Sequence, residues 1–234
     1  MAFVGYVGFL NEPNMKILSL NLCLDLSGHS RKERLDKIIN FVNQENVDIL
    51  LLQEGVRSCL LYNTISYLSN KLNFNNYQRS YLGVLFFQEW RLGILSKNEI
   101  TETNSCYIEI PQKEWLDALP IPFRRRVIAT KINNIWYVNV HLSSSPKTQT
   151  DRESQVNKLL DFVKSLDSVV VLGGDFNFDK NNNCFKMILD NGFKLIGESV
   201  PDFVFVNDDL YSGFKVVLND GTVTDHNGGI LVEI

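Results

Sequence analysis

The spacing of apolar residues along this chain predicts helices and strands that alternate throughout residues 15–234. Residues 31–45 carry Leu35, Ile38 and Val42 at helical spacing, and Ser30 just before them suits an N-cap. Residues 151–166 show a second apolar helical face. Two shorter helices are expected at residues 64–71 and 183–191, the latter with Gly192 in the C-cap position.

Short apolar runs between these segments predict the strands. The run 47–53 is apolar on both faces, as is typical of a fully buried strand. Asn133 and Asn134 form a hairpin-type turn between two runs. We expect strands at residues 16–21, 47–53, 81–87, 92–96, 127–132, 135–141, 168–172, 203–206, 215–218 and 229–234.

Many strands with only a few helices between them predict an α+β fold. The expected architecture is a four-layered α/β/β/α sandwich of two packed mixed sheets. No repeat, low-complexity tract or long linker divides the 234 residues. We therefore expect a single domain at residues 15–234, preceded by an N-terminal extension at residues 1–14.

Charge and cysteine content narrow the class of protein. The net charge of -4 argues against a dedicated, salt-driven nucleic-acid binder, but not against an enzyme that contacts phosphate briefly. The four cysteines are far apart without a CxxC pair, which favours free thiols over structural zinc or a disulfide framework. Residues 1–14 make a poor signal peptide, and no stretch reaches the roughly 20 apolar residues of a membrane span. We expect a cytoplasmic monomer without stable membrane association.

Five polar motifs stand where apolar runs end, which is where a rigid scaffold can hold a hard metal ion and two imidazoles. The motifs are Ser19-Leu20-Asn21, Leu52-Gln53-Glu54, Asn139-Val140-His141-Leu142, Gly173-Gly174-Asp175-Phe176-Asn177 and Thr224-Asp225-His226.

Glu54 comes shortly after four consecutive apolar residues, with Gln53 between, and a carboxylate at the mouth of a buried strand needs a cation or hydrogen-bond donors. A divalent ion such as Mg²⁺ suits it. Taken alone, Glu54 is equally well explained as a surface residue opening a loop, and Asn21 is better explained as a turn former.

Asp175 and Asn177 lie two residues apart, so in extended backbone both can face one ligand while Phe176 packs inward. The two preceding glycines allow close approach of the backbone. A simple turn is the alternative, although such turns rarely follow so apolar a strand.

His141 and His226 each stand at the edge of an apolar strand, whereas His29 lies in a polar loop and is expected to face solvent. Either histidine alone is more often structural than catalytic. Asp202, which opens another apolar strand, could orient an imidazole through a hydrogen bond.

Arg124, Arg125 and Arg126 form the basic cluster of the chain. A solvated strand edge and a phosphate clamp explain it equally well, since the guanidinium fork matches phosphate oxygens.

Together the motifs resemble the endonuclease/exonuclease/phosphatase superfamily, which includes pancreatic deoxyribonuclease and the apurinic endonucleases. The sequences SLN, LQE, VHL, GDFN and DH occur here in the family's order, from about Met15 to Ile234. Arg152 and Gln155 look like the family's R-x-x-Q, and DFVFV looks like its D-Y-I-F-V strand.

The resemblance implies a role for each polar residue of the motifs. Glu54 and Asn21 would hold the metal, Mg²⁺ or Mn²⁺, with help from Asp225. Asp175 would position or deprotonate the attacking water. The other implied roles are phosphate contact by Asn177, proton transfer and charge stabilisation by His141 and by His226 paired with Asp202, and support of His141 by Glu89. Independently of the resemblance, the guanidinium of Arg125 makes it the candidate for substrate binding.

Departures from the family pattern concern the substrate more than the reaction. Cys23 stands where apurinic endonucleases carry an acidic residue, Thr224 replaces a serine, and Asn-Gly-Gly follows His226 in place of x-Pro.

The first hypothesis is a metal-dependent phosphodiester hydrolase, a nuclease that cleaves DNA or RNA by in-line attack of an activated water. The alternatives are a phosphoesterase acting on a phospholipid headgroup or a small phosphorylated molecule, and a non-catalytic binding module on the same fold.

Overall fold

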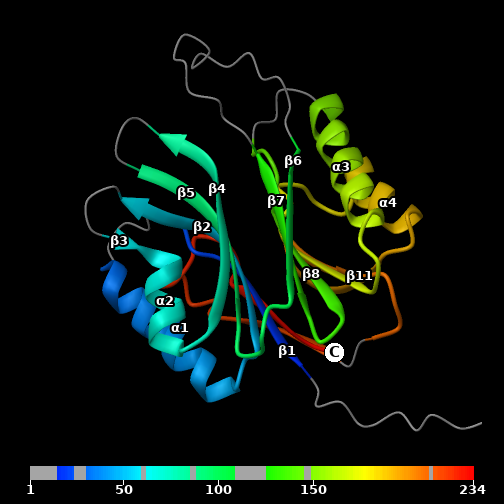
Figure 1. Ribbon diagram of the computed structural model, residues 1–234. Coiled ribbons are helices and arrows are strands. Elements are labelled where there is room, and N and C mark those ends of the chain that lie inside the picture. Colours follow the sequence, from blue (N-terminus) through cyan, green and yellow to red (C-terminus); the bar gives the residue numbers. More distant parts are fainter. Residues whose placement is uncertain are drawn as a thin grey trace, which may run out of the picture.

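The computed structural model describes residues 15–23, 30–58, 62–84, 88–108, 125–144, 149–210 and 213–234 (Figure 1). The predicted N-terminal extension, His29, Cys59 and Arg124 lie outside these residues.

The first sheet, sheet A, has seven strands in the order β12-β13-β1-β2-β5-β4, with β3 paired to β2. Only β1 and β2 run parallel among its paired strands. Its strands are β1 (Lys16–Asn21), β2 (Ile49–Ser58), β3 (Tyr62–Asn63), β4 (Asn75–Val84), β5 (Gln88–Ser96), β12 (Gly213–Val217) and β13 (Gly229–Glu233).

The second sheet, sheet B, has six strands in the order β10-β11-β9-β8-β7-β6. Here β8 and β9 form the parallel pair. Its strands are β6 (Glu102–Tyr107), β7 (Arg126–Ile132), β8 (Ile135–His141), β9 (Val170–Asp175), β10 (Lys194–Ser199) and β11 (Asp202–Val206).

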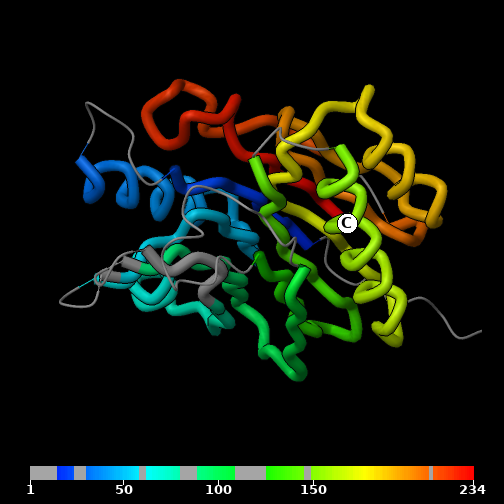
Figure 2. The backbone as a smooth tube through the Cα atoms, turned by 90° about the horizontal axis from the view of Figure 1, so that it is seen from above, coloured from blue at the N-terminus to red at the C-terminus, as the bar shows by residue number. Residues whose placement is uncertain are grey.

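In the described part of the chain, four helices cover the outer faces of the two sheets. Helices α1 (Arg31–Glu45) and α2 (Thr64–Leu72) lie on sheet A, and α3 (Gln149–Lys164) and α4 (Asn183–Asp190) lie on sheet B (Figures 1 and 2). A third apolar core, which includes Ile17, Leu51, Ile94, Tyr137, Val171 and Val204, fills the space between the sheets. The predicted α+β, four-layered sandwich of two mixed sheets is confirmed.

Local sequence explains where α1 begins and ends. The Ser30 hydroxyl accepts a hydrogen bond from the backbone N–H of Glu33, which is the N-cap arrangement expected from the sequence. Asn46 ends the helix in the left-handed conformation with φ 55°. At the end of α4, Gly192 has φ 87°, one residue after Asn191 caps the helix.

The apolar pattern gives the bounds of β1, α1 and β8 and misses β3, β6 and β10. Strand β6 is largely exposed at the edge of sheet B, so its polar sequence ETNSCY carries no burial signal. Strand β4 begins at Asn75, before the predicted start at residue 81, because its first half is polar and partly exposed. Among the described residues, no helix is both long and apolar enough to cross a bilayer.

The two parallel strand pairs determine where polar side chains gather. Asn21 pairs with Gln53 at the carboxyl end of β1, where the pairing of β1 with β2 stops, and His141 pairs with Asp175 at the carboxyl ends of β8 and β9. Asn21 contacts Asp175 directly, so these two groups of residues lie together at one end of the sandwich.

Candidate active site

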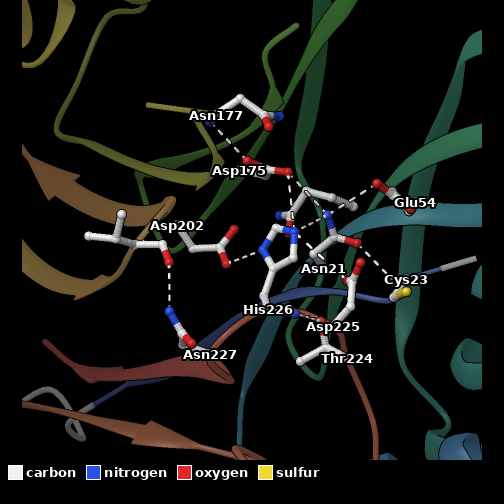
Figure 3. Close-up of polar contacts among 12 residues, drawn as sticks. Asn21, Cys23, Glu54, Asp175, Asn177, Asp202, Thr224, Asp225, His226 and Asn227 are labelled. Atoms are coloured by element: carbon white, nitrogen blue, oxygen red, sulfur yellow. Dashed lines mark hydrogen bonds and ion pairs between the residues drawn. The ribbon is translucent and has the colours of Figure 1, made fainter. Parts of the chain in front are cut away.

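The side-chain amide of Asn21 lies at the centre of the polar cluster. Its Nδ2 is 3.3 Å from Glu54 Oε1, 3.1 Å from Asp175 Oδ2 and 3.3 Å from His226 Nε2 (Figure 3). Its Oδ1 accepts a hydrogen bond of 2.9 Å from the backbone N–H of Cys23. The amide of Asn21 therefore joins residues from both sheets and separates two carboxylates.

Glu54 reaches the cluster because β2 is irregular at this point. The pairing of β2 with β5 shifts between Leu52 and Gly55, and Glu54 has φ 53°. Its Oε1 lies 4.0 Å from Nε2 of His141. A non-glycine residue with positive φ is costly and persists only where the surroundings hold it.

Asp175 is the most buried carboxylate of the cluster, with a relative exposure of 1%. Its Oδ2 is 3.2 Å from Nε2 of His141, and its Oδ1 accepts a hydrogen bond from the N–H of Asn177. The side-chain amide of Asn177 donates to the carbonyl of Leu142, so this turn is tied to the residue after His141.

Glycine is required at position 174, just before Asp175. Gly174 has φ 146°, and a Cβ there would lie 2.0 Å from the carbonyl oxygen of Val140. The close approach expected from the sequence is thus found at the pairing of β9 with β8.

His226 and Asp202 form a hydrogen-bonded pair. Nδ1 of His226 lies 2.6 Å from Oδ2 of Asp202, which leaves Nε2 directed toward Asn21 and Asp175 (Figure 3). The loop that carries His226 is held by Thr224, whose hydroxyl accepts from the N–H of His226, and by Asn227, which donates to the carbonyl of Val200. Nothing in the sequence pattern indicates the contact of Asn227.

Burial and neighbouring charges in the cluster favour an anionic Asp175 beside a cationic His226. Burial acts to raise the pKa of Asp175, but the hydrogen bond from His141 and the charges of His141 and His226 hold it below the usual value. Burial acts to lower the pKa of His226, but Asp202, Asp175 and Asp225 raise it to about 9. Burial raises the pKa of Asp202 to about 7, against the effect of its bond with His226. Since three carboxylates stabilise the imidazolium, we place the shared proton on His226.

The donor groups fit a hard divalent cation. Glu54, His141 and Asp175 place one ligand atom each within 4.8 Å of one another, as do Asp175, Asp202 and His226. Carboxylate oxygens suit Mg²⁺ or Mn²⁺. Asn21 turns its amide nitrogen, rather than its oxygen, toward the carboxylates. Asp225 lies at the rim, with 59% of its side chain exposed.

Arg34 of α1 is a supporting residue that the sequence pattern does not reveal. Its guanidinium is buried and donates to the carbonyls of Leu22, Cys23 and Val223. It thereby ties the segment after Asn21 to the segment before Asp225. Its position in an amphipathic helix suggests a solvated charge, so only the tertiary contacts identify it.

The R-x-x-Q residues hold the chain just after His141. Oε1 of Gln155 accepts from the N–H of Ser143, and Arg152 donates to the carbonyl of Ser143. Both side chains come from α3.

Arg125 and Arg126, the described members of the arginine cluster, lie at the same end of sheet B. Pairing of Val127 with Val140 and of Arg126 with Tyr107 places Arg126 next to His141 across the sheet. Alternation gives Arg126 and His141 the same face, toward sheet A, and gives Arg125 the other face. The Arg126 guanidinium lies 4.1 Å from the ring centroid of Tyr107.

Glu89, like Arg125, is a predicted site residue that the structure places away from the cluster. Its carboxylate accepts from Arg91 and lies near Arg57. Arg91 also donates a hydrogen bond to Gln78, and Gln78 donates one to Ser66 of α2, on the outer face of sheet A. His141 faces the space between the sheets, so support of His141 by Glu89 remains a prediction that this geometry does not favour.

Two packed mixed sheets flanked by helices, with the polar cluster at the strand ends, define a deoxyribonuclease-like α+β sandwich. The chain belongs to the endonuclease/exonuclease/phosphatase family, whose model matches residues 18–226. Members of this family are metal-dependent hydrolases of phosphate esters. A search of curated proteins found no match.

Solved structures share the fold at low sequence identity. An endonuclease/exonuclease/phosphatase family protein from Leptotrichia buccalis has a TM-score of 0.74 at 18% identity, covering 93% of this chain and 98% of that one. A mannosyl-6-phosphatase from Bacteroides thetaiotaomicron has a TM-score of 0.68 at 16% identity, covering 94% and 99%. D. rerio TDP2 in complex with a single-strand DNA product has a TM-score of 0.69 at 15% identity, covering 95% and 99%.

Proposed function

We propose that this protein is a divalent-metal-dependent phosphodiesterase whose substrate is a DNA or RNA strand. The observation that carries the proposal is the convergence of Glu54, His141 and Asp175 beside the hydrogen-bonded pair of His226 and Asp202. This set combines a metal-ligating carboxylate, a buried anion and an imidazolium within one cluster.

The side chains of the cluster divide between them the tasks required for attack of water on phosphorus. Asp175, kept anionic by its histidine neighbours, accepts or orients the proton of the attacking water. Nε2 of His226 carries a proton that can stabilise a phosphoryl oxygen or pass to the leaving oxygen, while Asp202 fixes the ring. Glu54 and Asp175 would hold the metal, with Asn21 and Asp225 beside them. A bound divalent ion supplies neutralisation of the charge that develops on the phosphate.

A nucleic-acid strand is favoured over a small phosphoester by the groups beyond the cluster. Arg126 offers a guanidinium for a neighbouring phosphate, and Tyr107, 46% exposed, offers a ring face beside it. TDP2, a fold relative, is seen with single-strand DNA product. The likeness to a mannosyl-6-phosphatase keeps a small phosphorylated molecule as the second candidate.

The decisive experiment measures hydrolysis of supercoiled plasmid, single-stranded DNA and RNA with Mg²⁺ or Mn²⁺. We expect cleavage that EDTA abolishes and that His226→Ala lowers about 10²- to 10⁴-fold, the usual contribution of a general acid or base. Asp209→Asn, in an exposed ion pair with Lys194, is the control and should cleave at the wild-type rate.

Two results would redirect the assignment. Activity confined to sugar phosphates or phospholipid headgroups would keep the phosphoesterase site and replace the substrate. A folded protein with no activity on any of these phosphoesters would overturn the enzyme assignment in favour of a binding module.

A further inference from the structure

Gln53 and Asn139 belong to two of the sequence motifs, yet neither has a part in the chemistry described above. Both are fully buried and they meet between the sheets, where Nε2 of Gln53 donates to Oδ1 of Asn139 at 2.7 Å. Gln53 belongs to β2 of sheet A and Asn139 to β8 of sheet B. This amide pair therefore joins the two sheets beneath the polar cluster.

Asn139 also forms hydrogen bonds with the irregular part of sheet A. Its Nδ2 donates to the carbonyls of Leu52 and Gly93, each at 2.9 Å. Leu52 and Gly93 are the last regular pair before the register of β2 and β5 shifts, and Glu54 lies inside that shift. A side chain from sheet B thus binds both carbonyls beside the irregularity that carries Glu54. A buried carbonyl without a hydrogen-bond donor costs free energy of folding. The two hydrogen bonds from Asn139 therefore stabilise the local backbone in this conformation.

We propose that Asn139 is a positioning residue that sets the carboxylate of Glu54 relative to His141. His141 follows Asn139 by two residues and so shares its face of β8. The same strand therefore presents the imidazole and, through Asn139, binds the backbone two residues before Glu54, whose Oε1 lies 4.0 Å from Nε2 of His141. The positive φ of Glu54 needs such support. This inference rests on the proposed function where it treats Glu54 as a metal ligand.

A purely structural role would make a different prediction. A buried hydrogen-bonded amide that only stabilises the fold would lower the melting temperature when replaced, without changing metal affinity in the folded protein. If Asn139 has a positioning role, its replacement also loosens the backbone at residues 53–56 and weakens metal binding. Partners that hold metal ligands in place typically contribute about 10- to 100-fold in affinity.

The test compares Asn139→Leu with two control variants. Thr130→Val changes a fully buried side chain on the same face of sheet B, whose hydroxyl has no hydrogen-bond partner among the described residues. Ile188→Ala opens a cavity in the core between α4 and sheet B, on the face of this sheet opposite to His141, and so lowers stability without replacing a residue of the cluster. Gln53→Leu removes the contact to Oδ1 of Asn139 but leaves both carbonyl contacts of Nδ2 in place.

Two measurements are made below the melting temperature of every variant. Hydrogen exchange of the metal-free protein reports on the amides of residues 53–56, and titration with Mn²⁺, followed by electron paramagnetic resonance, reports the dissociation constant. For Asn139→Leu we expect faster exchange at these amides and a dissociation constant raised about 10- to 100-fold. Gln53→Leu should change both less, and the two controls should match the wild type.

Wild-type exchange and wild-type Mn²⁺ affinity in Asn139→Leu would overturn the proposal, whatever its melting temperature. If Asn139→Leu does not fold, Asn139→Ser removes the same donors with a smaller change in volume and decides the question in the same way. A wild-type protein that neither binds Mn²⁺ nor hydrolyses a phosphoester would refute the proposed function. Hydrogen exchange at residues 53–56 would still decide whether Asn139 holds this backbone.

Discussion

Asp175 occupies a position that is unfavourable for a carboxylate unless positive charge surrounds it. It is almost fully buried and lies near Glu54, and the amide of Asn21 contacts both carboxylates. His141 and His226 supply the compensating charge, which holds the pKa of Asp175 low. The same carboxylates raise the pKa of His226, so each group maintains the charge state that the other needs.

The pH dependence of turnover should follow from this mutual stabilisation. Asp202→Asn replaces the charged acceptor of the His226 hydrogen bond with a neutral amide oxygen, and so removes the negative charge that raises the pKa of His226. Burial, which lowers that pKa, remains. The imidazolium would then lose its proton at lower pH, so the alkaline limb of the kcat/KM profile should move toward lower pH. Profiles measured from pH 5 to 10 test this, with Asp209→Asn as the unaffected control; an alkaline limb that stays in place would exclude His226 as its source.

Sheet B aligns one functional side chain from each of several neighbouring strands. Tyr107, Arg126, His141, Asp175 and Asp202 stand in one cross-strand row, because the pairings of β6, β7, β8, β9 and β11 are in register at this end. Neighbouring strands lie about 4.8 Å apart, so the row extends from the buried carboxylates to the exposed Tyr107 in steps of that length. Such a row can contact consecutive groups of an extended ligand.

This register distinguishes Arg126 from Arg125 as the phosphate contact. Arg126 shares a face with His141, whereas Arg125 lies on the face toward the helices. We expect Arg126→Gln to raise KM for single-stranded DNA about tenfold, the effect of losing roughly 1.4 kcal/mol of binding, with little change in kcat. Arg125→Gln is the matched control, and its KM should change less. Steady-state kinetics of both variants decide between them, and a larger effect at Arg125 would contradict the register argument.

Much of this arrangement can be predicted from the sequence, because the apolar or polar character of each residue indicates whether it is buried. Apolar runs predict the central strands, and the residues that end them predict Glu54, His141, Asp175 and His226. Strand β6 escapes prediction because it is exposed, although it carries Tyr107. The irregularity at Glu54, the amide orientation of Asn21 and the burial of Arg34 depend on contacts between distant segments, which apolar spacing does not encode.

The candidate metal site joins the two halves of the sandwich. Glu54 comes from sheet A and Asp175 from sheet B, so an ion held by both carboxylates would link the sheets where these two groups otherwise repel. Binding to the folded state alone stabilises it by mass action, by about 2.7 kcal/mol at a hundredfold excess over the dissociation constant. For a chain of 234 residues, this corresponds to a rise in melting temperature of roughly 5–10 °C.

The variant Glu54→Gln distinguishes stabilisation by the bound metal from the stability of the metal-free protein. The variant keeps the shape of the side chain but removes a negative charge near Asp175, so the metal-free protein should melt at or above the wild-type temperature. It should lose most of the rise caused by Mg²⁺ or Mn²⁺, because a neutral amide is a weaker ligand for a hard ion. Thermal melts of both proteins with EDTA and with each metal measure the two effects together. A metal-free variant that melts lower, yet keeps the full metal-dependent rise, would mean that Glu54 supports the fold instead of the ion.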